Sequence, residues 1–174
     1  TFVIGFPGEL AAEGGVAGFL HDLNLLAALG IRLVVVHGAR PQIEAELKEK
    51  HLRSRYARGL RITDAAALVA VKHAAGVLRL ELEAQLSQGL PNSPMAGAQI
   101  RVASGNFITA QPVGVVDGID FQFTGSVRKV DTVAISRRLD AGDVVLISHL
   151  GFSPTGEIFN LAWEDIAEST AIAL

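Results

Sequence analysis

The stretch Leu33-Val34-Val35-Val36-His37-Gly38-Ala39-Arg40-Pro41-Gln42-Ile43 decides the fold class of this chain. It begins as an apolar, β-branched run, passes through a turn of small residues and re-enters a polar segment that favours a helix. Such a run is typical of a buried parallel strand, and a turn of this kind aims backbone N–H groups at an anionic ligand. The stretch therefore predicts an α/β fold with a ligand site at the carboxyl end of this strand.

A second turn of the same kind lies at the start of the chain. There the apolar segment Phe2-Val3-Ile4 runs into Gly5-Phe6-Pro7-Gly8-Glu9, with a helix further on. Open α/β sheets bind their ligands at the carboxyl ends of neighbouring strands. We therefore expect the two turns to line one pocket.

Composition narrows the class of protein. The chain has 174 residues, 49% of them hydrophobic, which is enough for a well-buried core. Its 15 basic and 18 acidic residues leave a net charge of −3 without a basic stripe, so nucleic acid is not expected as a partner. The chain has no cysteine, which excludes disulfides and thiolate catalysis. Without an apolar run of about 18 residues or a signal-peptide pattern, we expect no membrane association and a cytoplasmic location.

The remaining segments alternate between helix and strand patterns. Apolar residues recur at helical spacing from Val16 to Ala27, and Gly30 predicts the end of that helix. Asp64 predicts the start of a second helix of about six turns, Thr63–Gln88, which Gly89 and Pro91 end. Further along, the pattern predicts a β hairpin within residues 100–123, a helix over 131–139, strands over 144–149 and 158–161, and a last helix from Glu164. This alternation indicates a three-layer α/β sandwich with a mainly parallel sheet.

Five motifs in order carry a resemblance: Gly38-Ala39-Arg40-Pro41-Gln42-Ile43, Gly59-Leu60-Arg61-Ile62-Thr63-Asp64, Ser104-Gly105-Asn106-Phe107, Thr124-Gly125-Ser126-Val127 and Phe159-Asn160-Leu161. Together they resemble the amino-acid kinase family over nearly the whole chain. Within that family, the sequences of the first and third motifs are similar to those in the kinase-like domains of the bacterial N-acetylglutamate synthases. These amino-acid N-acetyltransferases make N-acetylglutamate from acetyl-CoA and glutamate in the first step of arginine biosynthesis.

The resemblance implies a domain over residues 1–174 that contains the N-terminal lobe of the amino-acid kinase fold and the start of its second lobe. The acetyltransferase domain of such proteins is not within this chain. The backbone amides of Gly38 and Ala39 would then face an acyl-amino-acid ligand, with Gly8 in the same pocket. Arg61 would pair with the ligand's carboxylate and Asn160 would hydrogen-bond it. A guanidinium offers a fork that matches a carboxylate. L-arginine and N-acetylglutamate are the implied small-molecule partners, with the arginine site expected largely in the second lobe.

Two departures from the kinase pattern stand out. Where the family's kinases carry a lysine at the end of the first strand, this chain has Gly5, and their Asn-x-Asn-Ala-Asp pattern here becomes Asn160-Leu161-Ala162-Trp163-Glu164. Phosphoryl transfer depends on positioning and charge stabilisation, so we expect neither kinase activity nor any catalytic residue in this segment. No cofactor is expected here, and acetyl-CoA enters only as a substrate of the parent enzyme. His37 ends a buried strand and is expected to be a structural histidine. His149 lacks a neighbouring His or carboxylate at metal-ligand spacing and the sequence has no zinc-type pattern, so no metal site is predicted.

Three functions stay open at this point: a regulatory domain of an N-acetylglutamate synthase, a working small-molecule kinase, or an assembly module without a ligand. Each site residue also has a structural alternative, since Arg61 could be a solvated surface arginine, Asn160 could bridge a turn and the glycines could serve turns.

The ends of the chain and the last helix suggest an incomplete unit. The chain starts on a strand and stops within a helix pattern, so we expect a piece of a longer protein. The last helix should expose an apolar face formed by Ile166, Ala167, Thr170, Ala171 and Leu174. That face predicts a homodimer or larger homo-oligomer, and the resemblance implies pairing through the helix Thr63–Gln88.

Overall fold

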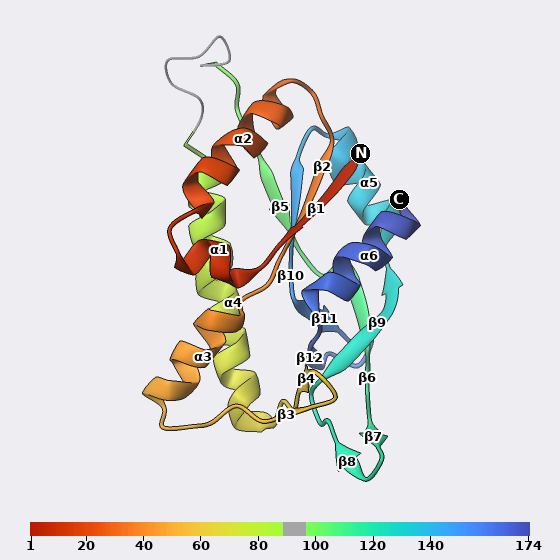
Figure 1. Ribbon diagram of the computed structural model, residues 1–174. Helices are drawn as coiled ribbons and strands as arrows, with labels where there is room; N and C mark the ends of the chain where they lie inside the picture. The colour runs from red at the N-terminus through yellow and green to blue at the C-terminus, as the bar shows by residue number, and fades with distance from the viewer. Residues whose placement is uncertain (89–96) are drawn as a thin grey trace.

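A parallel sheet of four strands forms the centre of the molecule (Figure 1). The structure is a computed structural model, and it describes residues 1–88 and 97–174. The strands lie in the order β1 (Phe2–Phe6), β2 (Leu33–His37), β10 (Val144–Ser148) and β5 (Val102–Ser104). All three pairings are parallel. Every side chain of β2 is buried, as expected for a strand covered on both faces.

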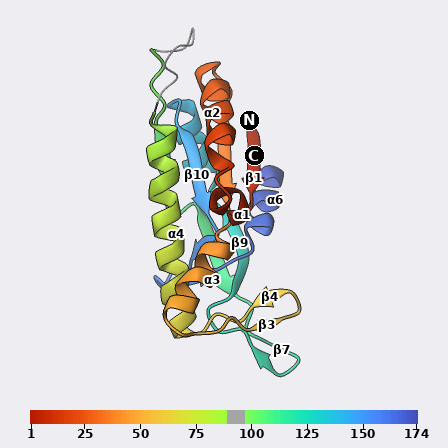
Figure 2. The same ribbon diagram turned by 60° about the vertical axis from the view of Figure 1, so that its left-hand side comes forward.

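Helices cover both faces of this sheet. Leu33 and Val35 of β2 point toward one face, where α2 (Val16–Ala28), α3 (Arg40–Glu49) and α4 (Ala65–Leu86) pack in one apolar cluster beside the short α1 (Gly8–Ala12). Val34 and Val36 point the other way, toward α5 (Thr132–Asp140) and α6 (Trp163–Ala173). The alternation of side chains along one strand thus builds three layers, and the predicted sandwich with a mainly parallel sheet is confirmed (Figure 2).

A second sheet of four strands lies beside the main one. Its order is β12 (Ile158–Asn160), β11 (Leu150–Phe152), β6 (Ile108–Pro112) and β9 (Gly125–Val130). Two small hairpins stand at the same end of the molecule, namely β3 (Tyr56–Ala57) with β4 (Leu60–Arg61), and β7 (Val115–Val116) with β8 (Ile119–Asp120) (Figure 1).

The prediction of one hairpin within residues 100–123 is therefore only partly right. The turn at Asp117-Gly118 does make a hairpin, between β7 and β8. The first β segment, β5, is instead a strand of the main sheet, because it pairs in parallel with β10. Such a pairing joins residues about 40 positions apart and leaves no local signal in the sequence.

Capping interactions set the predicted helix ends. Gly30 has φ +81°, its N–H donates to the Ala27 carbonyl at 2.9 Å, and the Ile31 N–H donates to the Leu26 carbonyl at 3.1 Å, which is a Schellman stop for α2. The Asp64 carboxylate accepts from the Ala67 N–H at 2.8 Å and caps α4. The stop predicted at Gly89 and Pro91 lies outside the described residues.

The last helix corrects the prediction of an exposed apolar face. Ile166 and Thr170 of α6 are both 0% exposed, because the helix packs against β1, β2 and β9. Only Ala171 and Leu174, near the end of that face, are exposed. The expectation that this face needs another chain to cover it is thus wrong. Among the described residues, no helix combines the length and the apolar character needed to cross a membrane.

Candidate functional site

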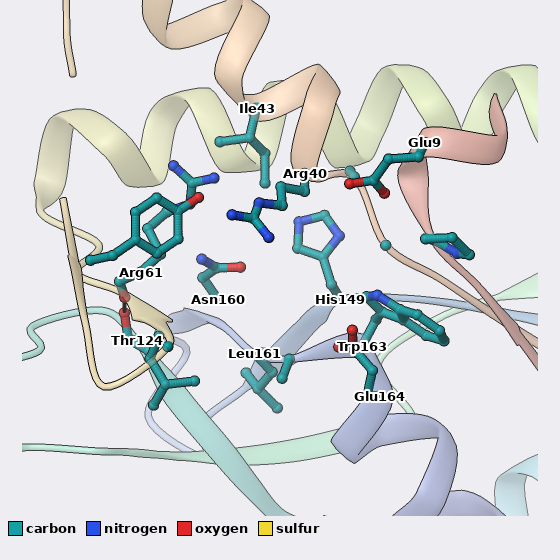
Figure 3. Close-up of a pocket in the computed structure, with 17 residues that line it drawn as sticks. Glu9, Arg40, Ile43, Arg61, Thr124, His149, Asn160, Leu161, Trp163 and Glu164 are labelled. Carbon is teal, nitrogen blue, oxygen red and sulfur yellow. Dashed lines mark hydrogen bonds between the residues drawn. The ribbon is translucent and has the colours of Figure 1, made fainter. Parts of the chain in front are cut away.

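A cavity of about 290 Å³ opens where β1 and β2 end (Figure 3). Pro7 and Glu9 of the first strand-end turn line it, together with Gly38 and Ala39 of the second. Because β1 and β2 are parallel neighbours, their carboxyl ends meet at one edge of the sheet. The prediction that the two turns share one pocket is confirmed.

The turn between β2 and α3 directs a helix N-terminus toward this cavity. Ala39 is the N-cap of α3 without a side-chain cap, and a proline stands in the first turn of the helix. The Gly38 N–H donates to the Phe6 carbonyl at 3.0 Å, so this amide is already used within the sheet edge. Among the described residues, the Ala39 N–H has no acceptor. Of the two amides expected to face a ligand, only that of Ala39 is free to do so.

Gly8 does not line the cavity, although both of its chain neighbours do. Its carbonyl accepts from the Gln42 Nε2 at 2.9 Å, and a Cβ at this position would lie 2.8 Å from the Ala39 Cα. Gly8 therefore allows the first turn to lie against the second, which is a packing role.

Arg61 lies in the cavity wall and is 7% exposed. Its Nη2 is 2.8 Å from the Glu44 Oε1, its Nη1 donates to the Ser54 hydroxyl, and the guanidinium lies 4.9 Å from the centre of the Tyr56 ring. Burial alone would raise the pKa of Glu44, but hydrogen bonds from Ser54, Tyr56 and Arg61 outweigh it and lower that pKa. Arg61 is thus a buried arginine with a carboxylate partner inside the chain, and not a solvated one.

Asn160 comes from β12 and is 8% exposed. Its Nδ2 donates to the Thr63 hydroxyl at 3.1 Å, and the Thr124 hydroxyl bonds the Arg61 carbonyl. Gly38, Ala39, Arg61 and Asn160, four of the five predicted site residues, therefore line one cavity, from three separate parts of the chain.

The indole of Trp163 lies against both strand-end turns (Figure 3). A Cβ at Gly5 would lie 2.4 Å from the Trp163 Cζ3, and a Cβ at Gly38 would lie 2.5 Å from the Trp163 Cδ1. Both distances are far below an ordinary carbon contact of about 3.5–4.0 Å. The two glycines make room for the ring, and the ring occupies the space that any side chain at position 5 would need.

One buried histidine, His149, lies in the cavity wall, and a second, His37, lies behind it. His37 at the end of β2 and His149 after β10 have ring centres 6.3 Å apart. Burial lowers the pKa of His37 to about 4 and that of His149 to about 3. Both rings are therefore neutral near pH 7. His149 lines the cavity with two ring nitrogens that have no hydrogen-bond partner among the described residues.

The charged side chains divide the cavity into two sides (Figure 3). The Arg40 guanidinium points into it, 5.3 Å from the centre of the Tyr56 ring, and has no carboxylate within 4 Å in the described part of the chain. Glu9 and Glu164 stand on the side of Trp163. The first side suits a carboxylate, and the second disfavours further negative charge.

Sequence reasoning missed Arg40, Tyr56, His149 and Trp163 as site residues. Arg40 had a signal, because it is the first helical residue after the strand-end turn. The others depend on distant packing, which no local pattern shows. Within residues 1–88 and 97–174, no three His, Asp or Glu side chains gather as metal ligands would.

Comparison with known proteins gives a consistent result. The sequence model of the Amino acid kinase family matches residues 1–174. The chain is 54% identical, over all of its 174 residues, to an amino-acid acetyltransferase of Ralstonia nicotianae, of which it covers 39%. It is 38% identical to N-acetylglutamate synthase from Neisseria gonorrhoeae, and the match covers 98% of this chain and 40% of the Neisseria chain. The TM-score is 0.90 against the crystal structure of the Neisseria protein complexed with coenzyme A and L-arginine. The complex of the Neisseria protein with coenzyme A and N-acetylglutamate gives a TM-score of 0.85. The chain thus spans about two fifths of the length of these relatives.

Proposed function

Because the chain belongs to the amino acid kinase family, we propose that it is the kinase-like, ligand-sensing part of an amino-acid acetyltransferase of the N-acetylglutamate synthase type. The whole protein would make N-acetylglutamate from acetyl-CoA and glutamate, the first step of arginine biosynthesis. Residues 1–174 would supply the N-terminal lobe of the kinase fold and the start of the second. This part carries out no catalysis and regulates the attached transferase.

The position of Trp163 carries the proposal that phosphoryl transfer is lost. By resemblance, the kinases of the family place a lysine at position 5 to neutralise the transferred phosphoryl group. Here the indole lies 2.4 Å from where even the Cβ of such a side chain would be. Glu9 and Glu164 add negative charge on the same side, which repels a phosphoryl group. Position 5 lacks the lysine of the kinases, and the indole of Trp163 leaves no space for a side chain there.

The opposite side of the cavity supports binding of an amino-acid ligand by its carboxylate. Arg40 supplies a free guanidinium and Ala39 a free N–H at the start of α3. Asn160 lies nearby and its position is fixed by Thr63. Arg61 would then act mainly by holding Tyr56 and the β3–β4 hairpin in place, since its own charge is paired with Glu44. N-acetylglutamate and L-arginine are the two ligands that we assign to this cavity. For L-arginine this places a site in the first lobe, whereas the resemblance places it largely in the second.

We also propose that two copies of the chain pair through α4. This helix exposes three large apolar side chains along one face, Val69, Val77 and Leu80, with exposures of 51%, 44% and 58%. Their spacing of eight and three residues places them on one stripe. A second copy would cover this stripe by the same face, as two-fold symmetry requires.

Two enzyme assays on the full-length protein test the function. The first follows acetyl transfer from acetyl-CoA to L-glutamate, with and without L-arginine. The second follows ADP release from Mg-ATP with N-acetylglutamate. We expect acetyl transfer that responds to L-arginine, and ADP release at the level of a protein-free blank. An Arg40→Ala variant should change the response to the ligand, whereas Arg137→Ala, an exposed cation away from the cavity, should not. ADP release that depends on N-acetylglutamate would contradict the proposal.

A further inference from the structure

A second cavity, of about 340 Å³, lies between α4 and the carboxyl ends of β5 and β10. It backs onto the first cavity, because one short segment separates the two. Ser148 and Leu150 line the second cavity, while His149 between them lines the first. Carboxyl ends of parallel strands are where open α/β sheets bind ligands, so its position alone makes it a candidate site.

The lining combines cations with neutral polar groups. Lys72 and Arg79 stand two helical turns apart on one flank of α4, and Ser104 and Asn106 come from the motif that follows β5. Gly76 faces the cavity between the two cations, and a Cβ there would meet nothing within 4 Å. Within one copy of the chain, the space between the cations is therefore open. Leu146, Leu150 and Phe152 supply an apolar part of the wall.

The charges of this cavity are not balanced within the described part of the chain. Lys72 has no carboxylate within 4 Å there, and Arg79 reaches only Glu83, at 3.6 Å from its Nε. That carboxylate also accepts from the Ser104 hydroxyl at 2.8 Å. Two cations thus face one carboxylate. The Gly105 and Asn106 N–H groups, just after the end of β5, have no acceptor among the described residues.

We propose that this cavity binds a small organic oxyanion, a phosphate ester or a carboxylate, whose apolar part lies against Phe152. Lys72 and Arg79 would neutralise the anionic group, and the N–H groups of Gly105 and Asn106 would donate to its oxygens. A ligand here would contact Ser148 and Leu150 and so touch the segment that carries His149 into the first cavity.

Calorimetric titration of the purified protein with inorganic phosphate and, separately, with propionate tests the site, with chloride balancing the ionic strength. We expect saturable binding of at least one probe, weakened about tenfold or more in Lys72→Ala/Arg79→Ala. Both side chains are exposed, so the variant keeps its core, which its unfolding temperature checks. Asn106→Ala removes a side chain from the lining but keeps the backbone N–H that the proposal uses, so it should weaken binding by no more than about threefold.

Two control variants separate this site from other causes. Lys48→Ala/Arg137→Ala removes the same net charge from exposed positions outside both cavities and should bind as the unmodified protein does. Arg40→Ala removes the free cation of the first cavity and should leave binding in the second unchanged. The proposal is wrong if neither probe binds saturably, if Lys72→Ala/Arg79→Ala binds with full affinity, or if Arg40→Ala alone abolishes binding.

Discussion

Replacing Gly38 by alanine forces a collision between the second strand-end turn and the indole of Trp163. The new Cβ would lie 2.5 Å from the Cδ1 and 2.9 Å from the Nε1 of that ring. An ordinary contact is about 3.5–4.0 Å, so the ring has to move by about 1 Å. Overpacking of this kind costs about 1–3 kcal/mol. In a chain of this size we expect the unfolding temperature to fall by about 3–9 °C.

Chemical denaturation followed by circular dichroism measures this cost, and a double-mutant cycle assigns it to the indole. In a Trp163→Ala background the collision partner is gone, so Gly38→Ala should then cost little, with a coupling energy of about 1–3 kcal/mol. Gly18→Ala is the matched control. Gly18 lies within α2, a Cβ there meets nothing within 4 Å, and alanine should stabilise the helix by about 0.5–1 kcal/mol. A Gly38→Ala variant that is equally destabilised with and without the indole would refute the reasoning.

Three further predictions concern the core, the histidines and a helix cap. Ile166→Ala should lower the free energy of unfolding by about 2–5 kcal/mol, because the side chain is fully buried. Ile172→Ala on the same helix, at a residue that is 80% exposed, should change it by less than about 0.5 kcal/mol. Equal effects of the two variants in urea denaturation would contradict the packing of α6. Burial lowers the pKa of His37 to about 4 and of His149 to about 3, so the unfolded chain takes up protons near pH 6.5 that the folded chain does not. Stability should be highest above about pH 7 and fall toward pH 4, by up to about 1.4 kcal/mol per pH unit for each histidine, and a flat profile in urea titrations between pH 7.5 and 5 would disprove this. Asp64→Ala removes the cap of α4 and should cost about 1 kcal/mol, which thermal unfolding can detect, and an unchanged transition would show that the hydrogen bond to Ala67 adds nothing.

Local patterns were sufficient for most of the main sheet and its helices. The apolar run of β2 predicts a strand buried on both faces, and the structure buries every residue of it. Gly30 and Asp64 predict helix ends by their own conformational and hydrogen-bonding properties, and the structure shows both interactions. These features depend on residues within a turn or two of each other, so the sequence displays them directly.

Features that depend on distant pairing were not predictable in this way. The strand predicted over 158–161 is present as β12, but its partners were not predictable, because the second sheet joins β6, β9, β11 and β12 from residues 108–160. β11 has only three residues, which is too short for an alternation signal. The exposed face predicted for α6 is wrong for the same reason, because β1 and β9 cover Ile166.

The candidate site likewise combines features that local motifs predict with features that depend on distant contacts. The strand-end motifs predicted which backbone turns meet, and four of the five expected residues line one cavity. The partner of Arg61 could not be predicted, since Glu44 lies 17 residues away on α3 and reaches it only in the folded chain. The position of Trp163 over Gly5 and Gly38 joins three segments at once, and the sequence showed only that a lysine was missing.

Calorimetric titration of the full-length protein with N-acetylglutamate and with L-arginine, repeated on Arg40→Ala, tests most directly whether the first cavity is a ligand-sensing site. The account predicts saturable binding of at least one of the two ligands. It also predicts binding about tenfold or more weaker when the free guanidinium beside Tyr56 is removed. No binding of either ligand, or equal affinity in the two proteins, would contradict it.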